Sequence, residues 1–218
     1  MAHIIGVVSQ KGGVGKSTLT RLVAREFAQQ GWDVKIADLD VSQGTCVEWG
    51  RIRQKNGVAP LIRVESFGRL EPALADAERF DLVVIDGAPH ATATTLDIAR
   101  VCDLVVIPTG LSLDDLRPAV VLAHELVRKG VAADKLVFVL ARVGESVASM
   151  EDARRFLAQA GYDVAQHELP DRIGYQRAMN AGLAASESAH RTLNEKAEAV
   201  AQDIADRLTA LVSRREVA

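Results

Sequence analysis

The chain has 218 residues, of which 48% are hydrophobic and 25% are charged, and its formal net charge is −3 at pH 7. This size and composition predict one folded domain, residues 1–218, with a full hydrophobic core. The charge excludes a uniformly basic nucleic-acid-binding chain, so any DNA contact would need a local basic patch. No apolar run approaches the ~18 residues of a membrane span and no basic leader precedes one, so we expect a cytoplasmic protein.

Short apolar runs alternate with amphipathic segments along the chain, a pattern typical of parallel strands joined by helical crossovers. The predicted strands are 4–8, 34–37, 61–64, 82–85, 104–107, 136–140 and 164–169. The predicted helices are 19–29, 45–55, 71–79, 92–100, 116–129, 149–160 and 194–215. We therefore predict an α/β fold in which a mostly parallel, twisted sheet carries helices on both faces and ligands bind at the carboxyl ends of the strands.

The most informative segment is Ser9-Gln10-Lys11-Gly12-Gly13-Val14-Gly15-Lys16-Ser17-Thr18, between the first predicted strand and the first predicted helix. Glycine-rich backbone and a helix N-terminus together bind phosphate oxygens. In such a loop Lys16 reaches the β- and γ-phosphates and the Ser17 hydroxyl holds Mg²⁺. We therefore predict a single P-loop NTPase domain whose nucleotide contacts are Gly12, Gly13, Val14, Gly15, Lys16, Ser17 and Thr18.

The loop departs from the common P-loop pattern, because Gln10 replaces its first glycine and Lys11 adds a second lysine. Lys-Gly-Gly-x-Gly-Lys-Ser resembles the deviant Walker A motif of the ParA/MinD family of dimerising ATPases. The resemblance implies that Lys11 crosses a dimer interface to contact the nucleotide bound by the partner; the alternative is a solvated surface charge. Because ten residues precede Lys11, the chain resembles the short ParA-type partition ATPases, which lack an N-terminal DNA-binding extension.

Aspartates follow two of the predicted strands, as Asp38-Leu39-Asp40 and as Asp86. Carboxylates at strand ends hold Mg²⁺ directly or through water, so we expect Ser17, Asp38, Asp40 and Asp86 at a metal site. Turn and helix-cap roles are the alternative for such aspartates. Asp38-x-Asp40 resembles the switch I segment of the family, which implies that Asp40 orients the attacking water.

The resemblance weakens beyond these aspartates. Val41-Ser42-Gln43 stands where the family has Pro-Gln, and Asp86-Gly87-Ala88-Pro89-His90 replaces the more frequent Asp-Thr-Pro-Pro. We interpret His90 as a partly exposed loop residue; the alternative is that it faces the active site. The segment 169–172 occupies the place of the loop on the adenine side, so the resemblance implies base contacts from Arg142, Pro170 and Asp171. The segment 175–182 resembles a late helix of the family.

The resemblance implies an Mg²⁺-dependent ATPase that hydrolyses ATP slowly without a partner and whose catalytic residues are Lys11, Lys16 and Asp40. The leading interpretation is a homodimer that positions or segregates cargo, either plasmid or chromosomal DNA or a large protein complex. It would bind non-specific DNA when loaded with ATP, associate with the nucleoid, and respond to a ParB-like or cargo-adaptor protein. Candidate DNA contacts are Arg154, Arg155, Arg172, Arg177, Arg191, Lys196, Arg207, Arg214 and Arg215.

A MinD-like membrane-associated ATPase is the main alternative. Leu208, Leu211 and Val212 with Arg214 and Arg215 offer a faint amphipathic anchor, but acidic residues dilute it and no aromatic residue follows Tyr175. The predicted last helix has a simpler interpretation, which is packing on the sheet through its apolar stripe of Ala197, Val200, Ile204, Leu208 and Leu211. A redox enzyme is disfavoured because Cys46 and Cys102 match no metal or disulfide spacing, so we expect both to be buried apolar residues.

Overall fold

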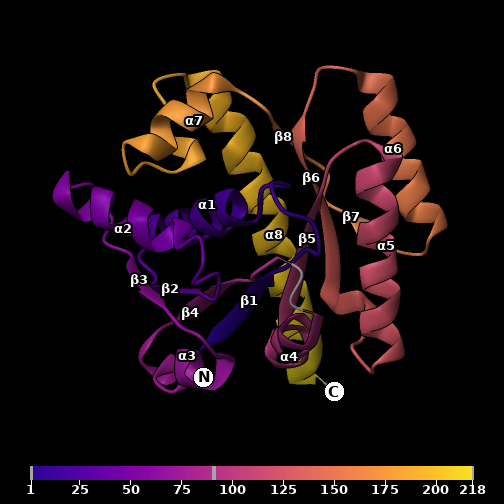
Figure 1. The fold of residues 1–218 in the computed structure, drawn as a ribbon, viewed down its shortest axis with the longest axis horizontal. Helices are drawn as coiled ribbons and strands as arrows, with labels where there is room; N and C mark the ends of the chain where they lie inside the picture. Colours follow the sequence, from indigo (N-terminus) through magenta and orange to yellow (C-terminus); the bar gives the residue numbers. More distant parts are fainter. Residues whose placement is uncertain (1, 90–91, 218) are drawn as a thin grey trace.

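The structure is a computed structural model that describes residues 2–89 and 92–217 (Figure 1). His90 lies outside these residues. All recorded strand pairs are parallel, in the order β3-β2-β4-β1-β5-β6-β7, with β8 beside β6. The strands are β1 (His3–Val7), β2 (Val34–Asp38), β3 (Arg63–Ser66), β4 (Leu82–Asp86), β5 (Leu104–Thr109), β6 (Leu136–Val143), β7 (Asp163–Val164) and β8 (Leu169–Pro170).

Helices connect these strands and cover both faces of the sheet (Figure 1). They are α1 (Lys16–Gln29), α2 (Thr45–Lys55), α3 (Leu70–Leu74), α4 (Thr92–Val101), α5 (Leu113–Arg128), α6 (Val147–Gln159), α7 (Ile173–Asn180) and α8 (Arg191–Val217), with single 3₁₀ turns η1 (Ala77–Arg79), η2 (Ala133–Lys135) and η3 (Ala185–Glu187). The predicted α/β fold with a parallel sheet between two helical layers is therefore confirmed.

Two hydrophobic clusters form the core, one on each face of the sheet. Successive strand residues point to opposite faces, so Val84 joins the cluster under α1, α2 and α8, whereas Ile85 joins the cluster under α3 to α6. Strands buried on both faces are continuously apolar, which is why these runs were visible in the sequence.

The last helix, α8, packs along the sheet through its apolar stripe. Its members are all at most 4% exposed: Ala197, Val200, Ile204, Leu208 and Leu211. The simpler interpretation of this segment is therefore confirmed, and Leu208 and Leu211 are not available as an exposed apolar face. Among the helices of the described residues, none combines the length and the apolar composition that a membrane span requires.

Two predicted elements are interrupted by side chains from distant segments. The prediction of one strand over 164–169 is wrong, because Arg154 binds the carbonyl of Gln166 (2.8 Å) and Asp203 binds the amide of His167 (2.7 Å). The predicted helix 71–79 divides into α3 and η1. The buried ammonium of Lys35 donates hydrogen bonds to the Ala73 carbonyl (3.1 Å) and to the Asp76 carboxylate at this break.

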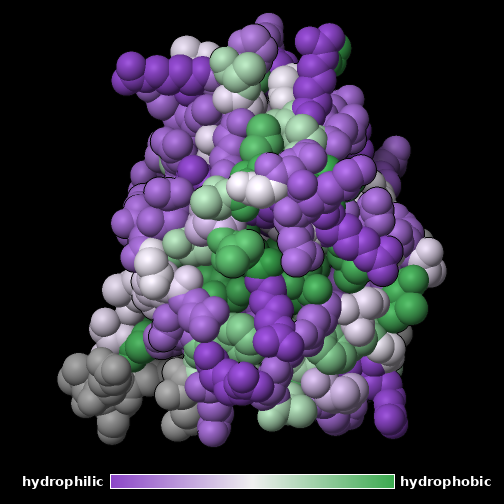
Figure 2. Space-filling model, turned by 90° about the vertical axis from the view of Figure 1, so that its left-hand side faces the viewer, coloured by the Kyte–Doolittle hydropathy of each residue, from purple (hydrophilic) through white to green (hydrophobic). Residues whose placement is uncertain are grey.

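Apolar side chains are exposed at the edge of the sheet formed by β3. Figure 2 shows this face, with hydrophobic side chains gathered in the middle of a largely hydrophilic surface. A groove between α2 and β3 is lined there by Val47, Val58, Leu61, Ile62 and Val64, among others, and Leu61 is 83% exposed.

The strand order brings the acidic strand ends together. β4 lies between β1 and β2, so Asp86 is the register partner of both Val7 and Asp38. The loop that follows β1 and the aspartates that end β2 and β4 therefore meet at the carboxyl edge of the sheet.

Candidate functional site

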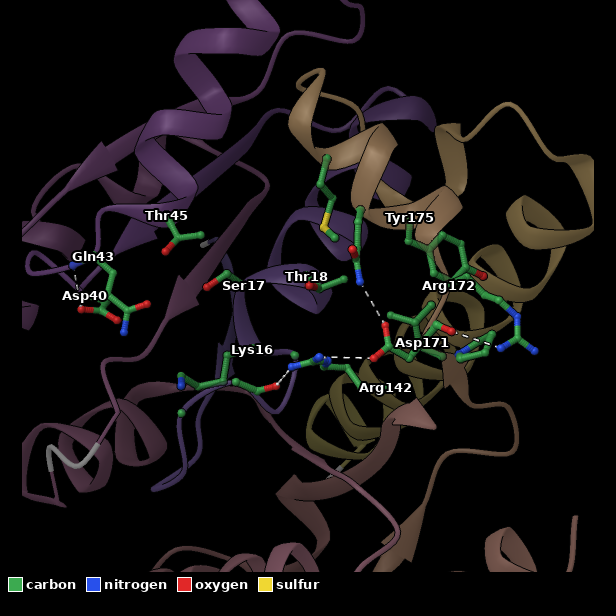
Figure 3. Close-up of a pocket in the computed structure, with 17 residues that line it drawn as sticks. Lys16, Ser17, Thr18, Asp40, Gln43, Thr45, Arg142, Asp171, Arg172 and Tyr175 are labelled. Atoms are coloured by element: carbon green, nitrogen blue, oxygen red, sulfur yellow. Dashed lines mark hydrogen bonds and ion pairs between the residues drawn. The ribbon is translucent and has the colours of Figure 1, made fainter. Parts of the chain in front are cut away.

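A pocket of about 330 Å³ lies at this carboxyl edge (Figure 3). The glycine-rich loop, the segment after β2 and the segment from β8 into α7 form its walls. It is lined by Gly12, Gly13, Gly15, Lys16, Ser17, Thr18, Asp40, Gln43, Thr45, Arg142, Leu169, Pro170, Asp171, Arg172, Tyr175, Gln176 and Met179. Most of the predicted nucleotide contacts therefore line one pocket, while Val14 is buried and is not among its lining residues.

The loop delivers the N-terminus of α1 to the pocket. Gly15 precedes the helix with φ 102°, a left-handed conformation that a residue with a side chain rarely adopts, and no side chain caps the helix. The free N–H groups of the first turn and the helix dipole make this end an anion site.

Lys16 supplies a positive charge at the phosphate-loop end of the pocket. Its side chain is largely buried, and its ammonium donates to the carbonyl of Lys11 (3.4 Å). Burial lowers the pKa of Lys16, and the negative charges of Asp86 and Asp40 partly oppose that shift. A partly desolvated ammonium between these carboxylates and the helix N-terminus is suited to phosphate oxygens.

Lys11 points away from this pocket. Its ammonium forms an ion pair with Asp115, in the first turn of α5, and donates to the carbonyl of Asp114 (3.4 Å). Lys11 is absent from the pocket lining, whereas Lys16 is part of it. The two lysines of the motif therefore have different surroundings within one chain.

Two buried carboxylates lie beneath the pocket. One oxygen of Asp86 accepts from the Thr20 hydroxyl (3.3 Å) and the other from the Cys46 thiol (3.2 Å). Burial raises the pKa of Asp86, and hydrogen bonds from Ser17 and Cys46 oppose that shift. One oxygen each of Asp38 and Asp86 and the Cys46 sulfur all lie within 4.8 Å of one another.

Asp38 also has a structural role that the sequence did not reveal. Its Oδ2 accepts from the amides of Cys46 (3.0 Å) and Val47 (3.3 Å), so it caps the start of α2, and its Oδ1 accepts from the Asp40 amide (3.0 Å). Asp40 lines the pocket, and its Oδ1 accepts from the Ser42 hydroxyl (2.7 Å).

The opposite wall joins the loop to the segment after β8. Arg142 has φ 55° and donates to the Gly13 carbonyl (2.6 Å) and to Asp171 (3.2 Å), as Figure 3 shows. Burial raises the pKa of Tyr175, beside them, to about 12, so its hydroxyl is neutral and donates to the Leu193 carbonyl (2.7 Å). Apolar and hydrogen-bonding groups thus adjoin the phosphate loop, as a nucleoside requires.

Sequence reasoning missed several side chains of the site. Cys46 is buried as expected, and its thiol also donates a hydrogen bond to the Asp86 carboxylate. No metal or disulfide spacing in the sequence could have indicated that role. Asp115 meets Lys11 across 104 positions of sequence. Tyr175 lies in the segment that resembles a late helix of the family, which was the available signal for it.

The residues can accommodate a nucleotide with Mg²⁺. The Ser17 hydroxyl and the oxygens of Asp38, Asp40 and Asp86 are the hard donors that Mg²⁺ prefers, and Mg²⁺ retains waters that outer carboxylates can hold. Asp38 and Asp86 are buried, and no ion pair with another described residue is recorded for either carboxylate. Two buried negative charges without such a partner favour the binding of a cation.

Many candidate DNA contacts are ion-paired within the chain. Arg154, Arg155, Arg172, Arg191 and Arg207 pair with Glu168, Asp152, Glu145, Glu195 and Asp163, respectively. Arg177, Lys196 and Arg214 are exposed, and no ion pair is recorded for them among the described residues. The side chain of Arg215 is not described.

A parallel sheet that sends a glycine-rich loop into a helix N-terminus, with aspartates on adjacent strands, defines a P-loop nucleotide-binding protein. Residues 5–185 match the family described as the CobQ/CobB/MinD/ParA nucleotide binding domain. The chain belongs to this family.

Individual relatives agree with this assignment. The chain is 29% identical over 133 residues to the chromosome-partitioning ATPase Soj of Thermus thermophilus. The matched region covers 48% of this chain and 53% of Soj. It spans about half the length, or less, of the curated relatives it matches.

Solved structures show the same fold. MinD of Pyrococcus horikoshii, a septum site-determining protein complexed with Mg-ADP, has a TM-score of 0.71 at 18% identity and covers 94% of this chain and 96% of its own. A ParA family ATPase of Chlorobium tepidum has a TM-score of 0.67 at 15% identity, with 93% and 99% covered.

Proposed function

We propose that this protein is an Mg²⁺-dependent ATPase that dimerises around two ATP molecules and uses the cycle to position or segregate cargo. The observation that carries the proposal is the separation of the two lysines: Lys16 lines its own pocket, whereas Lys11 does not. A lysine on the rim of the phosphate loop that does not serve its own pocket can serve the pocket of a second copy.

Each part of the pocket has a role in this proposal. The helix α1 N-terminus and Lys16 bind the β- and γ-phosphates, and Arg142, Pro170 and Asp171 border the base. Mg²⁺, held through Ser17 with Asp38, Asp40 and Asp86 around it, would neutralise phosphate oxygens. Asp40 orients water toward the γ-phosphorus; the bond to the β,γ-bridging oxygen breaks, and ADP and inorganic phosphate leave.

Lys11 makes turnover depend on the dimer. A cation delivered in trans to a transferring phosphate accelerates hydrolysis by about 10³–10⁵ in comparable NTPases. An isolated chain would therefore turn over slowly. Loss of the γ-phosphate removes contacts from the segment after Asp40, and the dimer opens.

DNA is the proposed surface for the ATP-bound dimer. Support comes from the Soj relative and from exposed cations on α7 and α8, Arg177, Lys196 and Arg214, for which no ion pair is recorded. Pairing two weak patches strengthens binding without new contacts. A ParB-like or cargo-adaptor protein would stimulate hydrolysis.

Co-sedimentation tests this choice of surface. With ATP, the protein should pellet with non-specific duplex DNA, and the bound fraction should fall steeply as salt is raised. With ADP it should stay in the supernatant. ATP-dependent pelleting with anionic liposomes but not with DNA would replace DNA by a membrane as the surface.

A further inference from the structure

The ion pair between Lys11 and Asp115 ties the phosphate loop to the start of α5 within one chain. The Lys11 ammonium bonds both the carboxylate of Asp115 and the carbonyl of Asp114. The Lys11 side chain keeps 44% of its exposure, and that of Asp115 keeps 21%. The lysine thus lies along the surface of its own chain, where solvent or a second molecule can reach it.

The carboxylate of Asp115 is also held by a neighbour other than Lys11. The Ser112 hydroxyl donates to its Oδ2 (2.7 Å). A Cβ atom on Gly110 would lie 2.5 Å from the same oxygen, so a side chain at position 110 would displace this carboxylate. Oδ2 is thereby held on one side by Ser112, and Oδ1 is presented to Lys11.

We propose that Asp115 is a positioning residue that latches Lys11 onto its own chain and opposes dimer closure until a second nucleotide-bearing copy displaces it. The proposal rests on the proposed function, in which Lys11 acts on the partner's phosphates. The ion pair between Lys11 and Asp115 has to break before the Lys11 ammonium can contact the phosphates of the partner. Each dimer therefore breaks two latches, and the monomer is favoured when nucleotide is scarce.

A simpler role for Asp115 is to stabilise α5, because carboxylates in a first helical turn interact favourably with the helix dipole. Asp114 allows the two roles to be separated. Its side chain is exposed and it meets Lys11 through its backbone carbonyl alone. Asp114→Asn therefore removes one negative charge from the same turn and keeps the latch, which makes it the matched control for Asp115→Asn.

Sedimentation equilibrium with a non-hydrolysable ATP analogue measures the latch. A partly exposed ion pair changes an equilibrium by about 1.4- to 5-fold, so losing two should tighten dimerisation of Asp115→Asn by about 2- to 30-fold. Asp114→Asn should match the wild type, and added salt should shrink the difference. Weaker dimerisation of Asp115→Asn, or equal effects of the two variants, would overturn the latch.

A second measurement needs neither nucleotide nor dimer. Brief acylation of the nucleotide-free protein, read by mass spectrometry, should modify Lys11 several-fold faster in Asp115→Asn than in the wild type or Asp114→Asn. Lys196, which is exposed on α8, is the internal reference. Unchanged Lys11 reactivity would refute the latch, whereas a reactive Lys11 in a chain that never dimerises would support the pairing and refute the proposed function instead.

Discussion

Cys46 shows how a single residue can adjust a site that its neighbours define. Its thiol, fully buried at the start of α2, donates to Asp86 and lies within 4.8 Å of an oxygen of Asp38. Burial raises the pKa of Cys46, so at neutral pH the sulfur carries its proton and acts as a donor. The carboxylate that faces the proposed Mg²⁺ site therefore depends on a weak donor from a helix.

Removing that donor should weaken the use of Mg²⁺. Because a single hydrogen bond contributes about 1 kcal/mol, Cys46→Ala should raise the Mg²⁺ concentration for half-maximal nucleotide binding by roughly five-fold, and Cys46→Ser should restore most of it. A fluorescent nucleotide titrated against Mg²⁺ reports the shift. Cys102→Ala, which removes the other buried thiol, is the control; an equal shift there would assign the effect to packing.

Lys16 and Asp40 should separate binding from hydrolysis. Lys16→Ala removes the ammonium that lines the phosphate end of the pocket, so the variant should lose ATP binding by at least ten-fold in calorimetry. Asp40→Ala should keep ATP binding and accumulate an ATP-bound dimer, because water is no longer oriented. Tight ATP binding by the first variant, or wild-type phosphate release by the second, would remove these roles.

At the scale of elements, α2 is tied to the segment that precedes α8. Arg53 makes a bidentate ion pair with Glu187 (2.7 and 3.1 Å), and the indole of Trp49 donates to the Leu183 carbonyl (2.9 Å). The Arg53 and Glu187 side chains are 3% and 11% exposed. The helix that Asp38 caps is therefore fixed at its other end to the wall beyond the pocket.

Breaking this buried pair should destabilise the fold. Arg53→Ala leaves the buried Glu187 carboxylate with Arg25 (3.3 Å) as its remaining ion-pair partner, so the free energy of unfolding in urea should fall by about 2 kcal/mol. Arg51→Ala, on the exposed side of the same helix, should change it by less than about 0.5 kcal/mol. Equal losses for the two variants would mean that the buried ion pair does not explain the effect, because alanine by itself favours the helix.

The same pair predicts how stability depends on pH. Burial alone would raise the pKa of Glu187, but hydrogen bonds from Arg53 and the Ala184 amide outweigh burial and lower it below its ordinary value of 4.5. The unfolded chain then binds the proton first, so the stabilisation is complete above pH 4.5 and is lost as pH falls through the lowered pKa of the folded state. Urea unfolding of Glu187→Gln across this range should show a weaker acid dependence than the wild type; an identical dependence would refute the assignment.

The sequence predicted elements better than the contacts between them. The helix 45–55 was predicted with the bounds of α2, since its periodicity is a local feature, whereas its cap by Asp38 was not predicted. The break within 164–169 was missed because it depends on Arg154 and Asp203, which no local pattern links to that segment. Likewise the loop motif indicated Lys16 and Lys11, but the Asp115 partner required the folded chain.

At the scale of the whole molecule, the fold gives each chain one phosphate-binding loop with two lysines in different surroundings. Lys16 completes its own pocket, and Lys11 is held on the rim by the start of α5. One chain therefore holds all the parts of the proposed ATPase except the cation that would come from a second copy. This arrangement would couple dimer formation to nucleotide binding and hydrolysis to dimer formation.

Light scattering coupled to size exclusion, with and without a non-hydrolysable ATP analogue and Mg²⁺, tests this coupling most directly. The wild type should shift from the mass of one chain to that of two when the analogue is present. Lys11→Ala should bind the analogue and keep the mass of one chain. A wild type that stays monomeric with bound analogue, or a Lys11→Ala variant that dimerises as readily as the wild type, would contradict the account.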